Sequence, residues 1–356
     1  MSVLDLVYLR QDRTLQVGVS PTHIAANPVR NEVYIVNTQS GTVSVIDAEA
    51  NRVAATISVH HLPSFVAVEP TGHRAYVTNS GSNTVSVLDL DRRREIAVAG
   101  TGEVPGVVRV SPDGRSLVVS NRNSGSTSIF DITPYDAAFS SVPAPKLRAA
   151  FSGCPGASDA VILPDSSKAF VACTGGHQVM AVGLAAAPGS WAAKQNPALM
   201  TDHLLAYLDV GKTPVHLAMK PDGGEIFVSN SDSDSISEIS TGTNEVGGTY
   251  VIGSRPVWGI VSADNGTLWV ANYGADSIAV YSIDDGRLVG NVRAGSAPDA
   301  LAFSEDEHLL LATDAHSGDV AVIRTEGRGG PALFTIMPAG ISPNSIAVKA
   351  LQKKKP

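Results

Sequence analysis

The stretch that decides the fold is Tyr76-Val-Thr-Asn79, which is followed after a short gap by Thr84-Val-Ser-Val-Leu-Asp89. Both segments alternate and are rich in β-branched residues, as β-strands are. The segment between them, Ser80-Gly-Ser-Asn83, has the composition of a tight turn. The sequence therefore predicts two adjacent antiparallel strands here.

The same pattern returns 42 residues later and then repeats along the whole chain. In seven copies, a residue that opens one strand precedes a residue that closes the next strand by 16 positions. The pairs are Pro21 and Asn37, Pro63 and Asn79, Pro105 and Asn121, Ala157 and Cys173, Pro214 and Asn230, Pro256 and Asn272, and Pro298 and Asp314. A fixed offset of this kind indicates a tandem structural repeat.

Each copy contains four predicted strands, called A to D in chain order. Turn sequences such as Pro112-Asp-Gly114 and Pro221-Asp-Gly223 lie between strands A and B. A four-stranded unit of this size cannot bury both of its faces alone, and stacking around an axis also protects its edges. We therefore expect an all-β fold, a single β-propeller of four-stranded antiparallel blades over residues 1–350, with a basic tail at 351–356.

The phrases at Tyr76–Asn79 and Thr84–Asp89 resemble the YVTN family of β-propeller repeat proteins. The resemblance covers nearly the whole chain, is strong in the first three copies and weakens in the fourth and seventh. It implies the propeller fold, whereas function is attached to a fold by individual sites. Proteins that resemble this family are often extracytoplasmic.

The two ends of the chain bear on the number of blades. Ser2-Val-Leu-Asp-Leu6 copies the strand C segment Ser86–Leu90, and Pro343-Asn-Ser-Ile-Ala-Val348 copies strand A. Counting gives eight A, seven B, eight C and eight D strands. This favours eight blades, closed by pairing of the C-terminal A strand with the N-terminal strands, with one B strand absent or upstream of Met1. Seven blades, the commoner form in the family, would leave these end strands unused and remain the alternative.

Composition narrows the classes of partner. The formal net charge is −8, which argues against nucleic acid, because phosphate binding needs clustered Lys and Arg. No apolar run is long enough to span a bilayer as a helix. The N-terminal residues lack the pattern of a signal peptide. We expect a monomer that is cytoplasmic if Met1 is the native start, and periplasmic or secreted if a leader was removed.

Loops D–A and B–C should gather at one mouth of the central channel, where loops on a rigid scaffold usually carry function. The second residue after each strand A marker should lie beside the axis. These residues are His23, Phe65, Val107, Asp159, His216, Trp258, Ala300 and Ser345. Our predicted ligand-binding residues at the mouth are His23, Phe65, Asp159, His216, Trp258, Tyr273 and Asp299.

Imidazole and carboxylate groups that converge on a channel could bind a divalent metal or a small anionic ligand. The metal candidates are His23, His216 and Asp159. The alternative is that these are ordinary polar residues of loops. Trp258 could stack on a flat ligand or pack between blades, whereas for Tyr273 packing or turn support is favoured.

The only two cysteines are expected within one blade. Cys154 lies in the loop before the fourth strand A, and Cys173 replaces the Asn that closes strand B. A disulfide between them is feasible and would favour an oxidising compartment, while two buried free thiols remain the alternative.

Two classes of function follow from these observations. The first is a binding or interaction propeller that recognises a protein, a saccharide or a small ligand through the mouth. The second is an enzyme or a metal- or haem-dependent propeller, of lactonase, lyase or d1-haem type by analogy of fold, with His23 or His216 as the axial candidate for haem. Insertions after Asp131 and over Leu184–His203 could form a lid or a docking surface.

Overall fold

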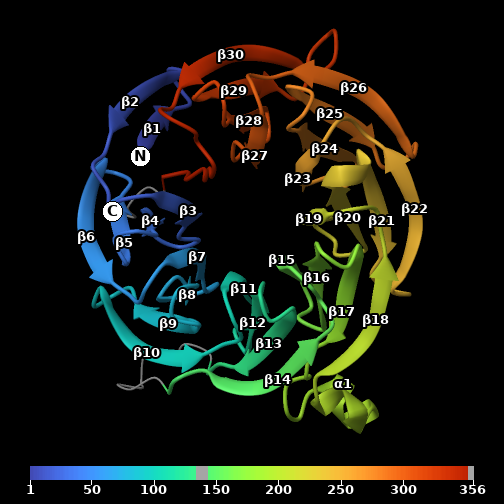
Figure 1. The fold of residues 1–356 in the computed structure, drawn as a ribbon. Helices are drawn as coiled ribbons and strands as arrows, with labels where there is room; N and C mark the ends of the chain where they lie inside the picture. The colour runs from blue at the N-terminus through green and yellow to red at the C-terminus, as the bar shows by residue number, and fades with distance from the viewer. Residues whose placement is uncertain (134–142, 352–356) are drawn as a thin grey trace.

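The computed structural model describes residues 1–133 and 143–351, which form a ring of small sheets around a central channel (Figure 1). Seven of the sheets are four-stranded and antiparallel, and in each the strands follow one another in chain order. The first strand of each blade lies innermost and the fourth lies on the outside of the ring. The predicted all-β propeller is therefore confirmed.

The strands are as follows. Blade 1 contains β3 (Pro21–Ala26), β4 (Glu32–Asn37), β5 (Thr42–Asp47) and β6 (Arg52–Ser58). Blade 2 contains β7 (Pro63–Val68), β8 (Arg74–Asn79), β9 (Thr84–Asp89) and β10 (Arg94–Gly100). Blade 3 contains β11 (Pro105–Val110), β12 (Ser116–Asn121), β13 (Ser126–Asp131) and β14 (Lys146–Ser152). Blade 4 contains β15 (Ala157–Ile162), β16 (Lys168–Cys173), β17 (Gln178–Gly183) and β18 (His203–Asp209).

The remaining blades follow the same order. Blade 5 contains β19 (Pro214–Met219), β20 (Glu225–Asn230), the short 3-10 helix η2 (Ser231–Ser233), β21 (Ser235–Ser240) and β22 (Glu245–Val251). Blade 6 contains β23 (Pro256–Val261), β24 (Thr267–Asn272), β25 (Ser277–Ser282) and β26 (Arg287–Arg293). Blade 7 contains β27 (Pro298–Phe303), β28 (Leu309–Asp314), β29 (Asp319–Arg324) and β30 (Ala332–Pro338).

The expectation of eight full blades is wrong, because the ring has seven. The N-terminal strands β1 (Ser2–Asp5) and β2 (Arg10–Thr14) form a separate two-stranded sheet, and β2 lies beside β30. Residues 339–351 form no strand, so the expected pairing of the chain ends is also wrong. The physical reason is the missing strand B, since without it the C-terminal segment has no antiparallel neighbour to pair with.

Side chains rather than sheet pairing hold the C-terminal segment in the ring. The Ser2 hydroxyl donates a hydrogen bond to the Ala339 carbonyl at 2.6 Å, and Lys349 Nζ donates one to the Asn27 carbonyl at 2.8 Å. Ile346 and Val348 pack against the apolar cluster beside β1. The predicted basic tail lies outside the described residues from 352 on.

The core is divided among the blade interfaces. Strands B and C carry the fully buried side chains, such as Tyr34, Val77 and Leu88, which pack together between blades 1 and 2. Burial of about 1.5–3 kcal/mol per large apolar side chain makes these interfaces the main source of stability. No helix in the described part of the chain is long and apolar enough to cross a membrane.

Hydroxyl groups at the mouth tie each blade to the next. Thr38 donates to the Pro63 carbonyl at 2.7 Å, Thr78 to the Gly106 carbonyl at 2.6 Å, and Thr174 to the Pro214 carbonyl at 2.8 Å. The acceptors lie at the starts of the neighbouring inner strands. These bonds fix the inner strands, on which the candidate site is built.

The insertion over Leu184–His203 carries the short helices α1 (Trp191–Gln195) and η1 (Pro197–Met200). Figure 1 shows α1 at the outer edge of the ring, so the idea of a lid over the channel is not supported. Arg148 Nε lies 2.5 Å from the carboxylate of Asp202, whose side chain is only 1% exposed, and this ion pair holds the insertion to blade 3. Most of the other insertion lies outside the described residues.

Candidate functional site at the central channel

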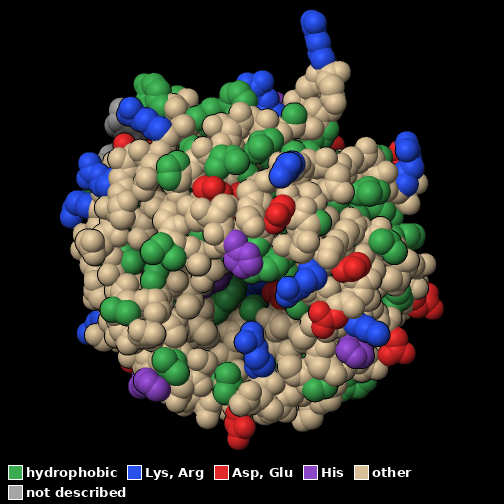
Figure 2. All heavy atoms as spheres, turned by 45° about the horizontal axis from the view of Figure 1, so that its top comes forward, with side chains coloured by type: hydrophobic (Ala, Val, Ile, Leu, Met, Phe, Trp, Pro, Cys, Tyr) green, Lys and Arg blue, Asp and Glu red, His purple; other side chains and the backbone are tan. Residues whose placement is uncertain are grey.

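Six of the seven predicted site residues lie on inner strands of the ring, Asp299 being on β27. His23 is on β3, Phe65 on β7, Asp159 on β15, His216 on β19 and Trp258 on β23. Figure 2 shows the centre of one face hollowed, with histidine, cationic and acidic side chains around the opening. The repeat register therefore carries these side chains to comparable depths around one channel.

Each of the two histidines stacks on an aromatic ring of the next blade. The ring centroids of His23 and Phe65 are 3.5 Å apart, and those of His216 and Trp258 are 4.1 Å apart. The interplanar angle is 27° in both pairs. Trp258 thus packs on a histidine of the preceding blade, and its stacking on a flat ligand stays a prediction.

Backbone hydrogen bonds select one tautomer of both histidines. The N–H of Val66 donates to Nδ1 of His23 at 3.4 Å, and the N–H of Gly259 donates to Nδ1 of His216 at 3.2 Å. With Nδ1 accepting, the proton of a neutral imidazole belongs on Nε2. Both rings are therefore hydrogen-bond donors at Nε2 rather than ready proton acceptors.

Burial keeps the two imidazoles uncharged. Desolvation, followed by the positive charge of Arg109, lowers the pKa of His23 to about 3. Desolvation also lowers the pKa of His216, with the Asp159 carboxylate opposing the shift and Arg109 adding to it. At neutral pH the site thus presents two neutral N–H donors.

Arg109 on β11 connects the two stacked pairs. Its Nη2 lies 3.0 Å from Asp159 Oδ1, and its Nε donates to the Ala160 carbonyl at 2.7 Å. Its guanidinium carbon lies 5.0 Å from the ring centroid of Phe65, which is a cation–π distance. The Arg109 side chain is 33% exposed, so its charge can meet a ligand in the channel.

Asp159 is held from several directions. Its carboxylate accepts hydrogen bonds from the N–H groups of Ala160 at 2.8 Å and Leu217 at 3.0 Å. His216 Nε2 lies 3.7 Å from Asp159 Oδ2, which is too long for a hydrogen bond. His23, Phe65, Arg109, Asp159, His216 and Trp258 thus form a chain of contacts, which we call the channel arc.

The sequence model of the family described as "Lactonase, 7-bladed beta-propeller" matches residues 9–147 and 260–335, which is more than half of the chain. This chain belongs to that family. The family's blade number agrees with the seven four-stranded sheets. The propeller assignment is therefore established, while the YVTN label is not confirmed.

Solved structures share the fold of this lactonase-family chain at low sequence identity. Kuenenia stuttgartiensis hydrazine synthase is 19% identical, with a TM-score of 0.62 over 88% of this chain and 97% of that one. A candidate 6-phosphogluconolactonase from Bacteroides uniformis is 18% identical, with a TM-score of 0.64 over 87% and 93%. Saccharomyces cerevisiae Sqt1 is 11% identical, with a TM-score of 0.74 over 92% and 88%. No curated protein matches the chain.

The sequence analysis missed Arg109. The available signal was a charged residue in the otherwise apolar strand Pro105-Gly-Val-Val-Arg-Val110, two positions after the expected channel residue Val107. Its link to Asp159 depends on how blades 3 and 4 pack, which no single repeat reveals.

The proposed metal ligands do not form a ligand set. No group of three or more His, Cys, Asp or Glu residues in the described ranges could hold a metal ion. Of the three candidates, His216 lies near Asp159, whereas His23 stacks on Phe65. We therefore derive no metal or haem chemistry from these residues.

Tyr273 and Asp299 lie outside the channel arc. The Tyr273 hydroxyl is 2.9 Å from His316 Nε2, and the guanidinium of Arg255 lies 5.2 Å from its ring centroid. These contacts agree with the favoured supporting role for Tyr273. Burial raises the pKa of Asp299 on β27.

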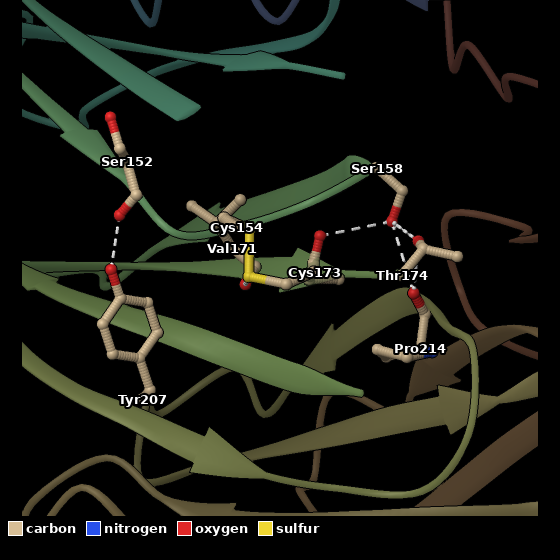
Figure 3. Close-up of a disulfide and its surroundings, with 9 residues drawn as sticks. Ser152, Cys154, Ser158, Val171, Cys173, Thr174, Tyr207 and Pro214 are labelled. Atoms are coloured by element: carbon tan, nitrogen blue, oxygen red, sulfur yellow. Dashed lines mark hydrogen bonds between the residues drawn. A yellow bond between two sulfur atoms is a disulfide. The ribbon is translucent and has the colours of Figure 1, made fainter. Parts of the chain in front are cut away.

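The structure joins Cys154 and Cys173 by a disulfide (Figure 3). Both cysteines are fully buried. In four of the other six blades the same two positions hold a glycine packed directly against the closing asparagine. These pairs are Gly18 and Asn37, Gly102 and Asn121, Gly211 and Asn230, and Gly253 and Asn272. The disulfide thus takes the place of a repeated glycine–asparagine contact, which we call the corner contact.

Blade 7 has a carboxyl pair at the same place. Asp314 replaces the asparagine, and Asp319 replaces the hydroxyl residue that an asparagine such as Asn79 bonds in other blades, there Thr84 at 3.1 Å. Desolvation, together with the hydrogen bond to Asp319 and its charge, raises the pKa of Asp314 to about 8. The pair therefore holds a proton at neutral pH, which the sequence did not reveal.

Proposed function

We propose that this lactonase-family propeller is an enzyme that hydrolyses the lactone of a small hydroxy acid or sugar acid at the channel arc. Membership of the family favours the enzyme class over the binding and interaction class. The single observation that carries the proposal is a partly exposed guanidinium, held in place by Asp159, between two neutral imidazole donors on the channel wall.

The charges of the arc suit the charge that develops during lactone opening. Water loses a proton to the solvent as it adds to the carbonyl carbon, the carbonyl oxygen becomes negative, the ring C–O bond breaks as the carbonyl re-forms, and the released alkoxide oxygen takes a proton back from the solvent. A fixed cation and fixed N–H donors stabilise such an oxyanion, because they need no reorganisation during the reaction. Arg109 supplies the cation, and the neutral imidazoles of His23 and His216 supply N–H donors.

Asp159 acts as a positioning residue. The Asp159 side chain is only 6% exposed, and its carboxylate accepts hydrogen bonds from two backbone N–H groups, so little of it is available to a ligand. Its contact with Arg109 restricts the guanidinium to one orientation, and this is how binding geometry contributes to rate. The stacked rings of Phe65 and Trp258 restrict the histidines in the same way.

The test is proton release from a panel of lactones, including glucono-δ-lactone, 6-phosphogluconolactone and an acyl homoserine lactone, corrected for spontaneous hydrolysis. We expect Arg109→Ala to lower kcat/KM on the order of a hundredfold, as loss of an oxyanion donor does. The matched control is Arg122→Ala, an exposed arginine of the same blade, which should leave the rate unchanged.

Two outcomes would overturn the proposal. One is a folded wild-type chain that hydrolyses no lactone of the panel. The other is equal activity of Arg109→Ala and the wild type. Saturable binding of an open-chain sugar acid without any turnover would instead return the chain to the binding class.

The disulfide supports the extracytoplasmic alternative for location, because such bonds persist in oxidising compartments. Intact mass of the protein purified from its native host, with and without reductant, tests this. A mass increase of two hydrogen atoms on reduction is expected, and no difference would favour a reducing compartment. The expected monomer stays a prediction, which the same sample can test by light scattering.

A further inference from the structure

The disulfide of blade 4 joins two tight turns at the channel mouth. The turns span residues 154–157 and 173–176, and each begins at one of the two cysteines. A backbone hydrogen bond of 2.9 Å from the Gly175 N–H to the Pro155 carbonyl links them a second time. Since both cysteines are fully buried, the two turns form one tightly connected unit.

This unit lies directly before two strands of the channel arc. Asp159 follows the first turn by two residues. The second turn contains Thr174, whose hydroxyl oxygen lies 2.8 Å from both the Pro214 carbonyl oxygen and the Ser158 hydroxyl oxygen (Figure 3). Pro214 is the first residue of β19, and His216 is the third. Thr174 thus connects the start of β15 to the start of β19.

The contacts of the arc around these two strands tolerate little displacement. The Asp159 carboxylate accepts a hydrogen bond from the N–H of Leu217 on β19 and one from Arg109 on β11, both at 3.0 Å. Nδ1 of His216 accepts a hydrogen bond from the N–H of Gly259 on β23 at 3.2 Å. A shift of β19 on the order of half an ångström would take such bonds out of the ordinary range.

We infer that Thr174, held in place by the disulfide, is a positioning residue of the channel arc, which fixes β19 against β15 and so orients His216 and Asp159. Its consequence for catalysis rests on the proposed function. A dithiol that reduces the bridge to two thiols is itself oxidised to a disulfide, and this exchange should loosen the second turn and with it the arc. The oxidising compartment that the bridge favours is then also the one in which the site is fully ordered.

The repeat supplies a matched control in blade 1. The Thr38 hydroxyl donates to the Pro63 carbonyl at 2.7 Å, and Pro63 begins β7. The N–H of Val66 on β7 donates to Nδ1 of His23 at 3.4 Å. Loss of the Thr38 hydroxyl should therefore disturb His23 and leave the other imidazole of the arc unchanged.

The first test records the imidazole 15N NMR signals of the ligand-free protein, labelled at its nine histidines. A single neutral tautomer gives two well-separated 15N shifts, whereas exchange between tautomers brings them together. We expect Thr174→Val to bring the shifts of His216 together and to leave those of His23 unchanged. Thr38→Val should do the reverse. Thr174→Ser, which keeps the hydroxyl, should give the wild-type spectrum.

Removal of the bridge should have the same local effect. We expect the Cys154→Ala/Cys173→Ala variant, and the wild type refolded with a dithiol, to change the His216 signals as Thr174→Val does. Leu88→Ala is the control for loss of stability alone, because Leu88 is buried in the core between blades 1 and 2. It should lower the urea midpoint and leave the His216 signals unchanged.

The second test is kinetic and uses a lactone that the wild type hydrolyses. We expect Thr174→Val to lower kcat on the order of tenfold with little change in KM, because misplaced groups slow the reaction more than they weaken binding. Thr174→Ser should restore kcat. Leu88→Ala, assayed where it is folded, should keep the wild-type kcat.

The inference fails on any of three results: unchanged His216 signals in Thr174→Val, an equal change of those signals in Leu88→Ala, or wild-type kcat in Thr174→Val beside changed signals. A wild type that hydrolyses no lactone would refute the proposed function by itself. The NMR comparison needs no substrate, so the positioning of His216 would still be tested.

Discussion

Buried titratable residues in the channel arc and in blade 7 make the stability of the fold depend on pH in opposite directions. The histidines of the channel arc are held uncharged, and the carboxyl pair of blade 7 is held protonated. In each case the cause is desolvation of the charged form together with a nearby like charge. Since a pKa that differs between the folded and unfolded chain makes stability depend on pH, each group predicts a measurable slope.

The carboxyl pair should weaken the fold at high pH. The pKa of Asp314 is about 8 in the folded chain against a reference value of 3.8, so the folded state holds the proton more tightly. This stabilising contribution is complete below the lower value and is lost as pH rises through the upper one. We expect Asp314→Asn to increase the free energy of unfolding at pH 9 by on the order of 3 kcal/mol, and much less at pH 5.

Urea unfolding at the two pH values measures this difference. Asn79→Asp is the matched reverse change, since it places a carboxyl at the same position of blade 2 opposite Thr84 rather than a second carboxyl. At pH 9, Asn79→Asp should change the free energy of unfolding by less than Asp314→Asn does. An Asp314→Asn effect that is the same at pH 5 and pH 9 would contradict the shared proton.

His23 should weaken the fold at low pH. Its pKa is about 3 in the folded chain against a reference value of 6.5. The contribution to stability is therefore complete above 6.5 and is lost as pH falls towards 3. Between pH 7 and pH 4, we expect the Tm of the His23→Gln variant to fall by less than the Tm of the wild type. The exposed His308→Gln serves as control, and parallel Tm curves for His23→Gln and wild type would refute this.

The repeat register predicted which residues lie on the inner strands, but not what they contact. His23, Asp159 and His216 were expected from position alone, because each is the second residue after its strand A marker and so the third residue of its inner strand. Arg109 and the Asp314–Asp319 pair were missed. The contact of Arg109 crosses a blade interface, and the carboxyl pair becomes visible only when strands B and C are aligned residue by residue.

At the scale of single elements, the corner contact fixes the end of strand B against the loop that precedes strand A. A Cβ added to Gly18 would lie 2.6 Å from Asn37 Cβ, so only glycine allows this approach. In blade 4 both partners are changed together, to Cys154 and Cys173, and the contact becomes covalent. The sequence located both cysteines in one blade but left their oxidation open.

The corner contact predicts that the disulfide can be replaced by the pair that the repeat uses elsewhere. The bridge spans 19 residues, and closing a loop of that size contributes about 3 kcal/mol. We expect Cys154→Gly/Cys173→Asn to lose less stability than Cys154→Ala/Cys173→Ala, because it restores the glycine–asparagine contact. Urea unfolding under oxidising conditions compares them. Equal loss in both double variants would show that the contact contributes nothing in blade 4.

At the scale of the whole molecule, the ring was predictable and its closure was not. The offset of 16 residues identified seven A–B hairpins, and those are the seven complete blades. The end segments match the strand consensus equally well, but a strand needs a paired neighbour to exist. Residues 343–348 lack one, so a good local sequence remains without sheet pairing.

The C-terminal segment should nevertheless stabilise the ring. Deleting residues 341–356 removes Ile346 and Val348 from the cluster that contains Leu311 and Met337. For two half-buried apolar side chains we expect a loss of about 2–4 kcal/mol, seen as a lower urea midpoint. Deleting only 352–356 should leave the midpoint unchanged. An unchanged midpoint in the longer deletion would show that the ring closes through β1 and β2 alone.

The side-chain pair at the corner contact could also be exchanged between blades by design. One backbone geometry accommodates an amide beside glycine, a sulfur bridge and a protonated acid pair, in blades that otherwise share their strand order. A designer could therefore move a covalent staple from blade 4 to another blade by changing two residues. A propeller of this family could be reinforced, or made sensitive to high pH, one segment at a time without altering the channel.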